Sequence, residues 1–168
     1  MWTRLYWVNG PWPGKLAISA RPRGGEWLED DLVSWQQEGI KSVLSLLTKE
    51  EEQDLDLKRE AEVTKAQGMQ FLSFPIVDRN VPTSQSAVVG VIEKIDENLS
   101  AERNVVIHCR QGIGRSGLIA ACLLILKGVD PSAALDRLSV ARGLPVPETD
   151  EQRRWIERYA ASLAGTKS

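Results

Sequence analysis

The sequence predicts one α/β domain over residues 1–168, built on a central, mostly parallel β-sheet flanked by helices. Three observations lead to this prediction. Strand-like and helix-like segments alternate along the chain, which is the pattern of βα units. The run at 104–109 is almost continuously apolar, as expected of a central parallel strand. The segment that follows it is apolar on all sides, as expected of a helix buried within the domain.

The first third of the chain is expected to contain three strands and one helix. Strands are predicted at 5–8 and 15–20, separated by the turn-rich sequence NGPWPG. A helix is predicted where apolar residues recur at helical spacing: Trp27, Leu28, Leu32 and Trp35. Gly39 is a typical C-cap for this helix, and the apolar run at 40–47 indicates a buried strand.

The middle of the chain begins with a helix start signal. Thr48 and Glu51 have the spacing of a capping box, and a helix is expected to continue from there to Gly68. The acidic run in its first turn is interpreted as a solvated helix terminus and not as a site. The sequence MQFLSFPI at 69–76 predicts the next strand.

A helix, a strand and a second helix are predicted to follow a loop at 77–84. The first helix would bury one apolar face: Ala87, Val88, Val91, Ile92, Ile95 and Leu99. The strand at 104–109 then leads into the buried helix at 116–127. Asp130 and Pro131 predict the start of a helix that ends near Arg142.

The last helix is predicted from a second capping box, formed by Thr149 and Gln152. Trp155, Ile156 and Tyr159 would supply its buried face.

Composition excludes some partners. The formal net charge of −2 gives no basic field for nucleic acid or for an anionic membrane. Two cysteines do not form a disulfide framework, which favours a reducing compartment. The longest apolar run, at 118–126, is too short to span a bilayer, and the N-terminus lacks the pattern of a signal peptide. We therefore expect a cytoplasmic monomer.

The stretch HCRQGIGRS at 108–116 predicts an anion-binding turn between a buried strand and a buried helix. Gly112 and Gly114 permit the positive φ values that such a turn needs. Successive N–H groups and the N-terminus of the helix would form a cup for a tetrahedral dianion. Arg115 is expected at the rim of this cup, where its planar fork can bind two phosphate oxygens.

Cys109 is predicted to lie at the bottom of the cup, where the same N–H groups would stabilise a thiolate. Ser116 can donate its hydroxyl to the sulfur. His108 has two open interpretations: its ring holds the loop by hydrogen bonds, or it is a core histidine without a chemical role. Cys122 is interpreted as a core residue, although a disulfide with Cys109 is conceivable.

HCRQGIGRS resembles the signature of the cysteine-dependent protein tyrosine phosphatases: His-Cys, five residues, Arg, then Ser or Thr. PGKLAISARP resembles the entry strand of the compact dual-specificity members, including the kinase-associated and prokaryotic forms. FPIVDRNVPTS resembles their general-acid loop. The resemblance implies a phosphatase-like fold and a cysteinyl-phosphate intermediate on Cys109. It also implies phosphate binding by the loop residues Arg110, Gln111, Gly112, Ile113, Gly114 and Arg115.

The resemblance further implies that Asp78 is the general acid, although a loop aspartate is also a common turn former. Gln152 resembles a glutamine that places the attacking water, and its capping box explains it equally well. No metal or other cofactor is expected, because the chain has one histidine and no clustered ligands.

The expected substrate is a phosphorylated protein or peptide, with phosphotyrosine favoured over phosphoserine or phosphothreonine. Ile113 makes the rim partly apolar, and the loop has no lysine of the kind that accompanies inositol phosphate substrates. Arg79 and Arg110 either add positive potential near the mouth or are simply solvated. The alternatives are a phosphopeptide-binding module, a phosphatase for a non-protein phosphoester, and a sulfurtransferase or arsenate reductase.

Overall fold

The computed structural model describes residues 3–165 and confirms the α/β prediction. Five strands form one sheet in the order β1-β2-β5-β3-β4. β1 is antiparallel to β2, and the other neighbouring pairs are parallel. The strands are β1 Tyr6–Val8, β2 Leu16–Ala20, β3 Ile40–Ser45, β4 Gln70–Ser73 and β5 Asn104–Cys109.

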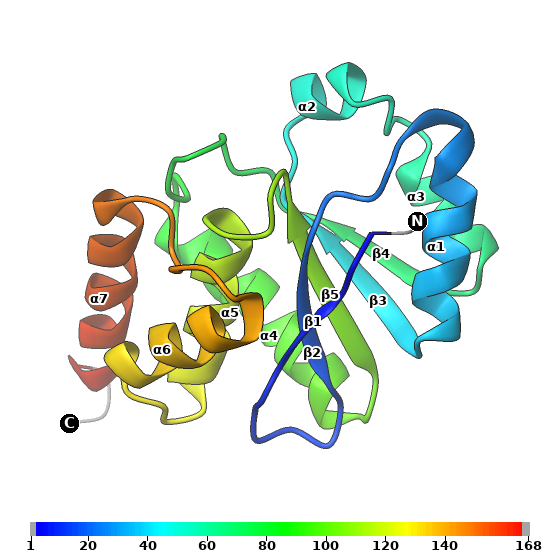
Figure 1. The fold of residues 1–168 in the computed structure, drawn as a ribbon. Coiled ribbons are helices and arrows are strands. Elements are labelled where there is room, and N and C mark those ends of the chain that lie inside the picture. The colour runs from blue at the N-terminus through cyan, green and yellow to red at the C-terminus, as the bar shows by residue number, and fades with distance from the viewer. Residues whose placement is uncertain (1–2, 166–168) are drawn as a thin grey trace.

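Helices cover both faces of the sheet (Figure 1). One face carries α4, α5, α6 and α7, and the other carries α1 and α3. The helices are α1 Leu28–Gln37, α2 Lys49–Asp54, α3 Glu60–Ala66, α4 Gln85–Ser100, α5 Arg115–Leu126, α6 Pro131–Arg142 and α7 Asp150–Gly165, and a 3₁₀ turn spans Gly25–Trp27. No helix among the described residues is long and apolar enough to cross a membrane.

The core forms around the two elements that the sequence marked as most apolar. β5 is the central strand, and its residues from Val105 to Cys109 are all buried. α5 follows it directly and is buried from Arg115 to Ile125, packed between the sheet and α4, α6 and α7. Removing this much apolar surface from water fixes β5 and α5 firmly, and with them the turn that joins them.

The cap predictions at three helix starts are confirmed. Thr48 accepts from the Glu51 N–H while the Glu51 carboxylate accepts from the Thr48 N–H. Asp130 caps α6, whose first residue is Pro131. The Thr149 hydroxyl accepts from the Gln152 N–H at the start of α7, and the Gln152 side chain accepts from the Thr149 N–H.

The predicted helix from 48 to 68 is two helices. α2 ends at Asp54 and α3 begins at Glu60. Asp56 adopts a positive φ of 56° between them, and its carbonyl accepts from the Gly25 N–H. The break lets Leu57 reach the core, where only 1% of its surface is exposed. The tertiary burial of one leucine therefore overrides a continuous helical pattern.

Two smaller expectations were also wrong. β4 ends at Ser73, short of the predicted residue 76. The backbone still runs beside β3 there, since Ile76 N–H donates to the Leu46 carbonyl. Trp27 precedes α1 and is half-exposed, with the Arg23 guanidinium 5.0 Å from its ring centroid.

Candidate active site

The turn between β5 and α5 wraps around the sulfur of Cys109. The Gly112 N–H donates to Sγ at 3.3 Å, and Oγ of Ser116 lies 3.3 Å from Sγ on its other side. Cys109 itself is buried, with 3% of its surface exposed. An N–H group, a hydroxyl and the N-terminus of α5 thus converge on the sulfur, which is the arrangement that stabilises a thiolate.

Two glycines shape this turn for different reasons. Gly112 has a φ of +73°, and a Cβ there would lie 2.5 Å from the backbone of Ser19. Gly114 does not adopt the positive φ that the sequence suggested, since its φ is −77°. Gly114 instead lies close to the Gln152 side chain, and a Cβ there would lie 2.9 Å from its amide and displace it.

Arg115 is not at the rim of the turn, because it is buried with 1% of its surface exposed. A fully desolvated guanidinium needs partners, and the nearest is Glu51 of α2. The two groups form two parallel hydrogen bonds of 2.6 and 2.9 Å. The carbonyl of Ile76 accepts a further hydrogen bond at 2.7 Å. The interpretation of the acidic run as solvated was therefore wrong for Glu51, which is 7% exposed.

In the buried Glu51–Arg115 pair, each group stabilises the charged form of the other. Burial disfavours the charged form of Glu51, but hydrogen bonds from Arg115 and Thr48 hold its pKa below the usual range. Burial likewise opposes the charge of Arg115, and the hydrogen bond with Glu51 together with the Glu51 and Asp78 carboxylates raises its pKa. Arg115 is therefore held as a cation beside the sulfur.

One donor of Arg115 is left unused. Its Nε is buried and has no hydrogen-bond partner among the described residues. A buried guanidinium N–H without an acceptor is costly, so its presence indicates a missing anionic or polar partner. An oxyanion bound in the turn would supply that acceptor.

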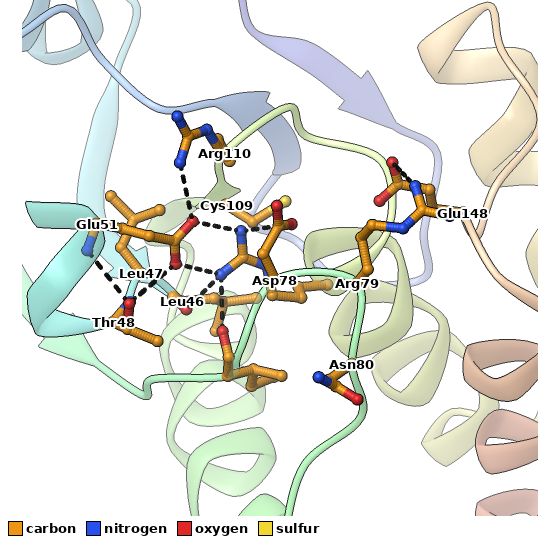
Figure 2. Close-up of polar contacts among 12 residues, drawn as sticks. Leu46, Leu47, Thr48, Glu51, Asp78, Arg79, Asn80, Cys109, Arg110 and Glu148 are labelled. Carbon is orange, nitrogen blue, oxygen red and sulfur yellow. Dashed lines mark hydrogen bonds and ion pairs between the residues drawn. The ribbon is translucent and has the colours of Figure 1, made fainter. Parts of the chain in front are cut away.

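Asp78 meets Arg115 from the opposite side. Its Oδ1 accepts from Nη2 of Arg115 at 3.0 Å, while its side chain is 47% exposed. The neighbouring Arg79 points away from this contact and pairs with Glu148 (Figure 2). The loop that carries Asp78 therefore places a carboxylate in contact with the arginine of the turn.

The remaining loop residues are more open to solvent. Arg110 and Gln111 are exposed, and Ile113 is half-buried. Arg110 is near Glu51, with 4.0 Å between Nη1 and Oε2, so it adds positive charge at the mouth of the turn (Figure 2). Arg79 is committed to an ion pair with Glu148 at 3.1 Å.

His108 faces the other side of the sheet from Cys109. Its Nε2 lies 2.6 Å from the Glu60 carboxylate of α3, and its Nδ1 has no partner among the described residues. Neither ring nitrogen therefore bonds to the loop, in contrast to the interpretation that the ring holds the loop by hydrogen bonds. The partner Glu60 lies 48 residues away in the sequence, and no local pattern marks it.

Gln152 is fully buried against the turn. Its side-chain oxygen accepts from the N–H groups of Glu148 and Thr149, and its Nε2 donates to the Asn80 carbonyl. It thus links the start of α7 to the loop of Asp78.

Cys122 is a buried core residue of α5, and burial raises the pKa of its thiol. No group of three or more potential ligands among residues 3–165 could hold a metal ion.

The Glu51–Arg115 pair gives a prediction about stability. Glu51→Gln should lower the free energy of unfolding at pH 7 by about 3 kcal/mol, because it leaves a buried guanidinium without its counter-charge. The pKa of Glu51 is lower in the folded protein than in the unfolded chain, so the wild type loses this contribution as the pH falls through the folded pKa. Urea denaturation should therefore show that the difference in the free energy of unfolding between wild type and Glu51→Gln becomes smaller at low pH. Glu50→Gln, on the exposed side of α2, is the matched control, and an equal effect of both changes would contradict the assignment.

Comparisons with known proteins agree with this geometry. Residues 18–129, more than half of the chain, match the family described as "Polymorphic toxin system, DSP-PTPase phosphatase". Cyclin-dependent kinase inhibitor 3 of Rattus norvegicus is 27% identical over 139 residues, which cover 82% of this chain and 65% of the relative. The chain therefore spans slightly less than two thirds of that relative.

Two solved structures share the fold. Kinase associated phosphatase, with its catalytic-site cysteine substituted by serine, superposes with a TM-score of 0.87 at 23% identity, covering 96% of both chains. PTPMT1 in complex with PI(5)P superposes with a TM-score of 0.77 at 16% identity, covering 96% of this chain and 99% of that one. The family match and the cysteine–arginine turn lead to one assignment: the chain belongs to the dual-specificity-type protein tyrosine phosphatases, in the family described for polymorphic toxin systems.

Proposed function

We propose that residues 1–168 form one catalytic domain that hydrolyses phosphomonoesters on proteins, phosphotyrosine above all, through a cysteinyl-phosphate on Cys109. The observation that carries the proposal is the unused, buried Nε of Arg115 next to the Cys109 turn. A phosphoryl group in the turn would accept a hydrogen bond from this donor and from the N–H groups that face into the turn. Arg115 would thus bind phosphate from the floor of the site, anchored by Glu51.

The first step is attack of the Cys109 thiolate on phosphorus. The S–P bond forms, the P–O bond to the leaving group breaks, and the leaving oxygen takes a proton from Asp78. Asp78 must first release Arg115, to which it is bound in this structure. The phosphate dianion provides the reason for release, because it replaces the carboxylate as the partner of Nη2 and disfavours a second anion nearby.

The second step is hydrolysis of the S–P bond. Water attacks phosphorus, its proton passes to the Asp78 carboxylate, and the sulfur leaves as a thiolate that Ser116 stabilises by donating its hydroxyl. Gln152 supports this step by fixing the loop of Asp78 through Asn80, and its side-chain oxygen is already engaged by two N–H groups. Its role in the proposal is therefore to position the loop and the start of α7.

The test is turnover of p-nitrophenyl phosphate by the purified chain in the presence of EDTA. We expect full activity with chelator and inhibition by vanadate, whose five-coordinate form resembles the in-line transition state. Loss of activity in EDTA would contradict the mechanism. Binding of a phosphotyrosine peptide without turnover would assign the chain to the binding modules instead.

Substrate choice is tested by comparing phosphotyrosine, phosphoserine and phosphothreonine peptides with a phosphoinositide in mixed micelles. The half-buried Ile113 gives the turn an apolar wall that suits an aromatic leaving group. We therefore expect the highest kcat/KM for the phosphotyrosine peptide. A higher kcat/KM for the phosphoinositide would indicate a non-protein substrate.

A further inference from the structure

The outer side of the catalytic turn is held by an arginine from a different element. Arg142, the last residue of α6, donates from Nε to the Gly112 carbonyl at 3.3 Å and from Nη2 to the Gln111 carbonyl at 3.2 Å. It follows the turn by about thirty residues and lies outside the cysteine–arginine motif. One guanidinium thus binds two consecutive carbonyl groups of the turn.

These carbonyls are rigidly coupled to the groups that face the sulfur. The Gln111 carbonyl and the Gly112 N–H belong to one planar trans peptide group, in which the two bonds point in opposite directions. The Gly112 N–H donates to Sγ of Cys109 at 3.3 Å. Arg142 and the Cys109 sulfur therefore hold opposite ends of the same peptide group. The Gly112 carbonyl is coupled in the same way to the Ile113 N–H, which turns away from Arg142.

The charge of Arg142 adds to its geometry. A cation bound to a carbonyl oxygen polarises the peptide group and strengthens its N–H as a donor. The guanidinium is itself held in place, because it lies 4.1 Å from the ring centroid of Tyr6 on β1. Stacking on an aromatic face restricts the plane of the guanidinium, so its two donors stay aligned with the two carbonyls.

We propose that Arg142 is a positioning residue for the phosphatase reaction: it turns two peptide groups of the catalytic loop so that their N–H groups face the thiolate and the phosphoryl group. The inference rests on the proposed function, since it assigns the N–H groups their role in that reaction. Arg142 acts through the backbone of Gln111 and Gly112 and has no contact with the reacting atoms in this assignment.

Two measurements on Arg142→Ala test the proposal. The rate of Cys109 alkylation by iodoacetamide reports the stabilisation of the thiolate and needs no turnover. The kcat/KM for p-nitrophenyl phosphate reports the complete site. We expect both to fall, the second by about 10- to 100-fold, which is the usual cost of a misplaced catalytic group. Cys122 should not compete in the alkylation, because it is fully buried.

Chemical rescue separates positioning from a purely structural role. Millimolar guanidinium, far below denaturing concentrations, should restore part of the alkylation rate and of kcat/KM in Arg142→Ala by occupying the vacated place over Tyr6. Arg142→Lys should be intermediate, because an ammonium does not hold two carbonyls in a fixed fork. Tyr6→Leu keeps the arginine and removes the aromatic ring on which it stacks. We expect the alkylation rate and kcat/KM of this variant to fall by about two- to fivefold.

Arg137→Ala is the matched control. Arg137 lies on the same helix and also donates to a backbone carbonyl, that of Asn9 in the β1–β2 connection, at 3.1 Å. It links α6 to the N-terminal hairpin without touching the catalytic turn. We expect wild-type alkylation and wild-type kinetics for this variant, with no stimulation by guanidinium.

The outcomes distinguish this inference from the proposed function. An inactive wild type would refute the function, while the alkylation rates would still decide whether Arg142 orders the turn. An active wild type with an unaffected Arg142→Ala variant would overturn the inference alone. Loss of kcat/KM with an unchanged alkylation rate would also overturn it, because Arg142 would then act on the substrate. If Arg142→Ala does not fold, an unaltered Arg142→Lys or Tyr6→Leu variant gives the same refutation.

Discussion

Cys109→Ser is expected to lower kcat for p-nitrophenyl phosphate by about 10⁶-fold, the order of loss found when the nucleophile of a covalent catalyst is removed. The physical reason is ionisation. The site is built to stabilise an anion on the sulfur, through the Gly112 N–H, Ser116 and the start of α5. A serine hydroxyl remains protonated at neutral pH under the same influences and is a far weaker nucleophile.

Binding should survive this change. The groups that we propose to hold phosphate, Arg115 and the inward N–H groups, remain in place. Loss of the thiolate also removes a negative charge from the floor of the site, so the affinity for phosphate should be equal or higher. Calorimetric titration with inorganic phosphate measures this. Cys122→Ala is the control and should retain wild-type kcat, and substantial turnover by Cys109→Ser would contradict the cysteinyl-phosphate mechanism.

Asp78→Ala is expected to lower kcat by about 10²- to 10⁴-fold, the usual contribution of one positioned proton donor. The deficit should depend on the leaving group. An alkyl phosphate needs the proton, whereas a fluorinated umbelliferone phosphate leaves almost unaided. The ratio of wild-type to variant kcat should therefore shrink as the leaving group becomes more acidic, measured over a series of aryl and alkyl phosphates.

The contact between Asp78 and Arg115 also bears on phosphate binding in this variant. Asp78 occupies Nη2 of Arg115 at 3.0 Å, so its removal frees a donor and deletes a competing anion. We expect tighter inhibition by phosphate. Asp78→Asn keeps an acceptor for Arg115 but cannot supply a proton, so it should lose kcat as well.

A constant deficit across the series would show that Asp78 only shapes its loop. The acid would then be sought at Asp150 or Glu148. Glu148 lies close to the turn, since a Cβ on Gly114 would be 3.0 Å from its Oε1. It is paired with Arg79, whereas Asp150 is exposed at the start of α7.

The sequence by itself determined the elements whose signals are local. The apolar run of β5 and the uniformly apolar α5 specify a buried strand followed by a buried helix, because no other arrangement removes both from water. The glycines between them predict a tight turn. At position 112 only glycine fits, because φ is positive and the backbone of Ser19 lies too close for a Cβ. The caps at Thr48 and Asp130 have all their partners within four residues, so they too were predicted correctly.

Only the tertiary structure decided which side chains meet at the site. Glu51 and Arg115 are 64 residues apart, and Arg142 reaches the turn from the far end of α6. In the sequence Glu51 is recognisable only as the capping-box partner of Thr48, and nothing there indicates that its carboxylate also binds Arg115. Its partner is fixed where the start of α2 meets the start of α5, because the buried guanidinium of Arg115 requires a counter-charge there. Such pairings depend on chain topology, and a local pattern of residues does not contain them.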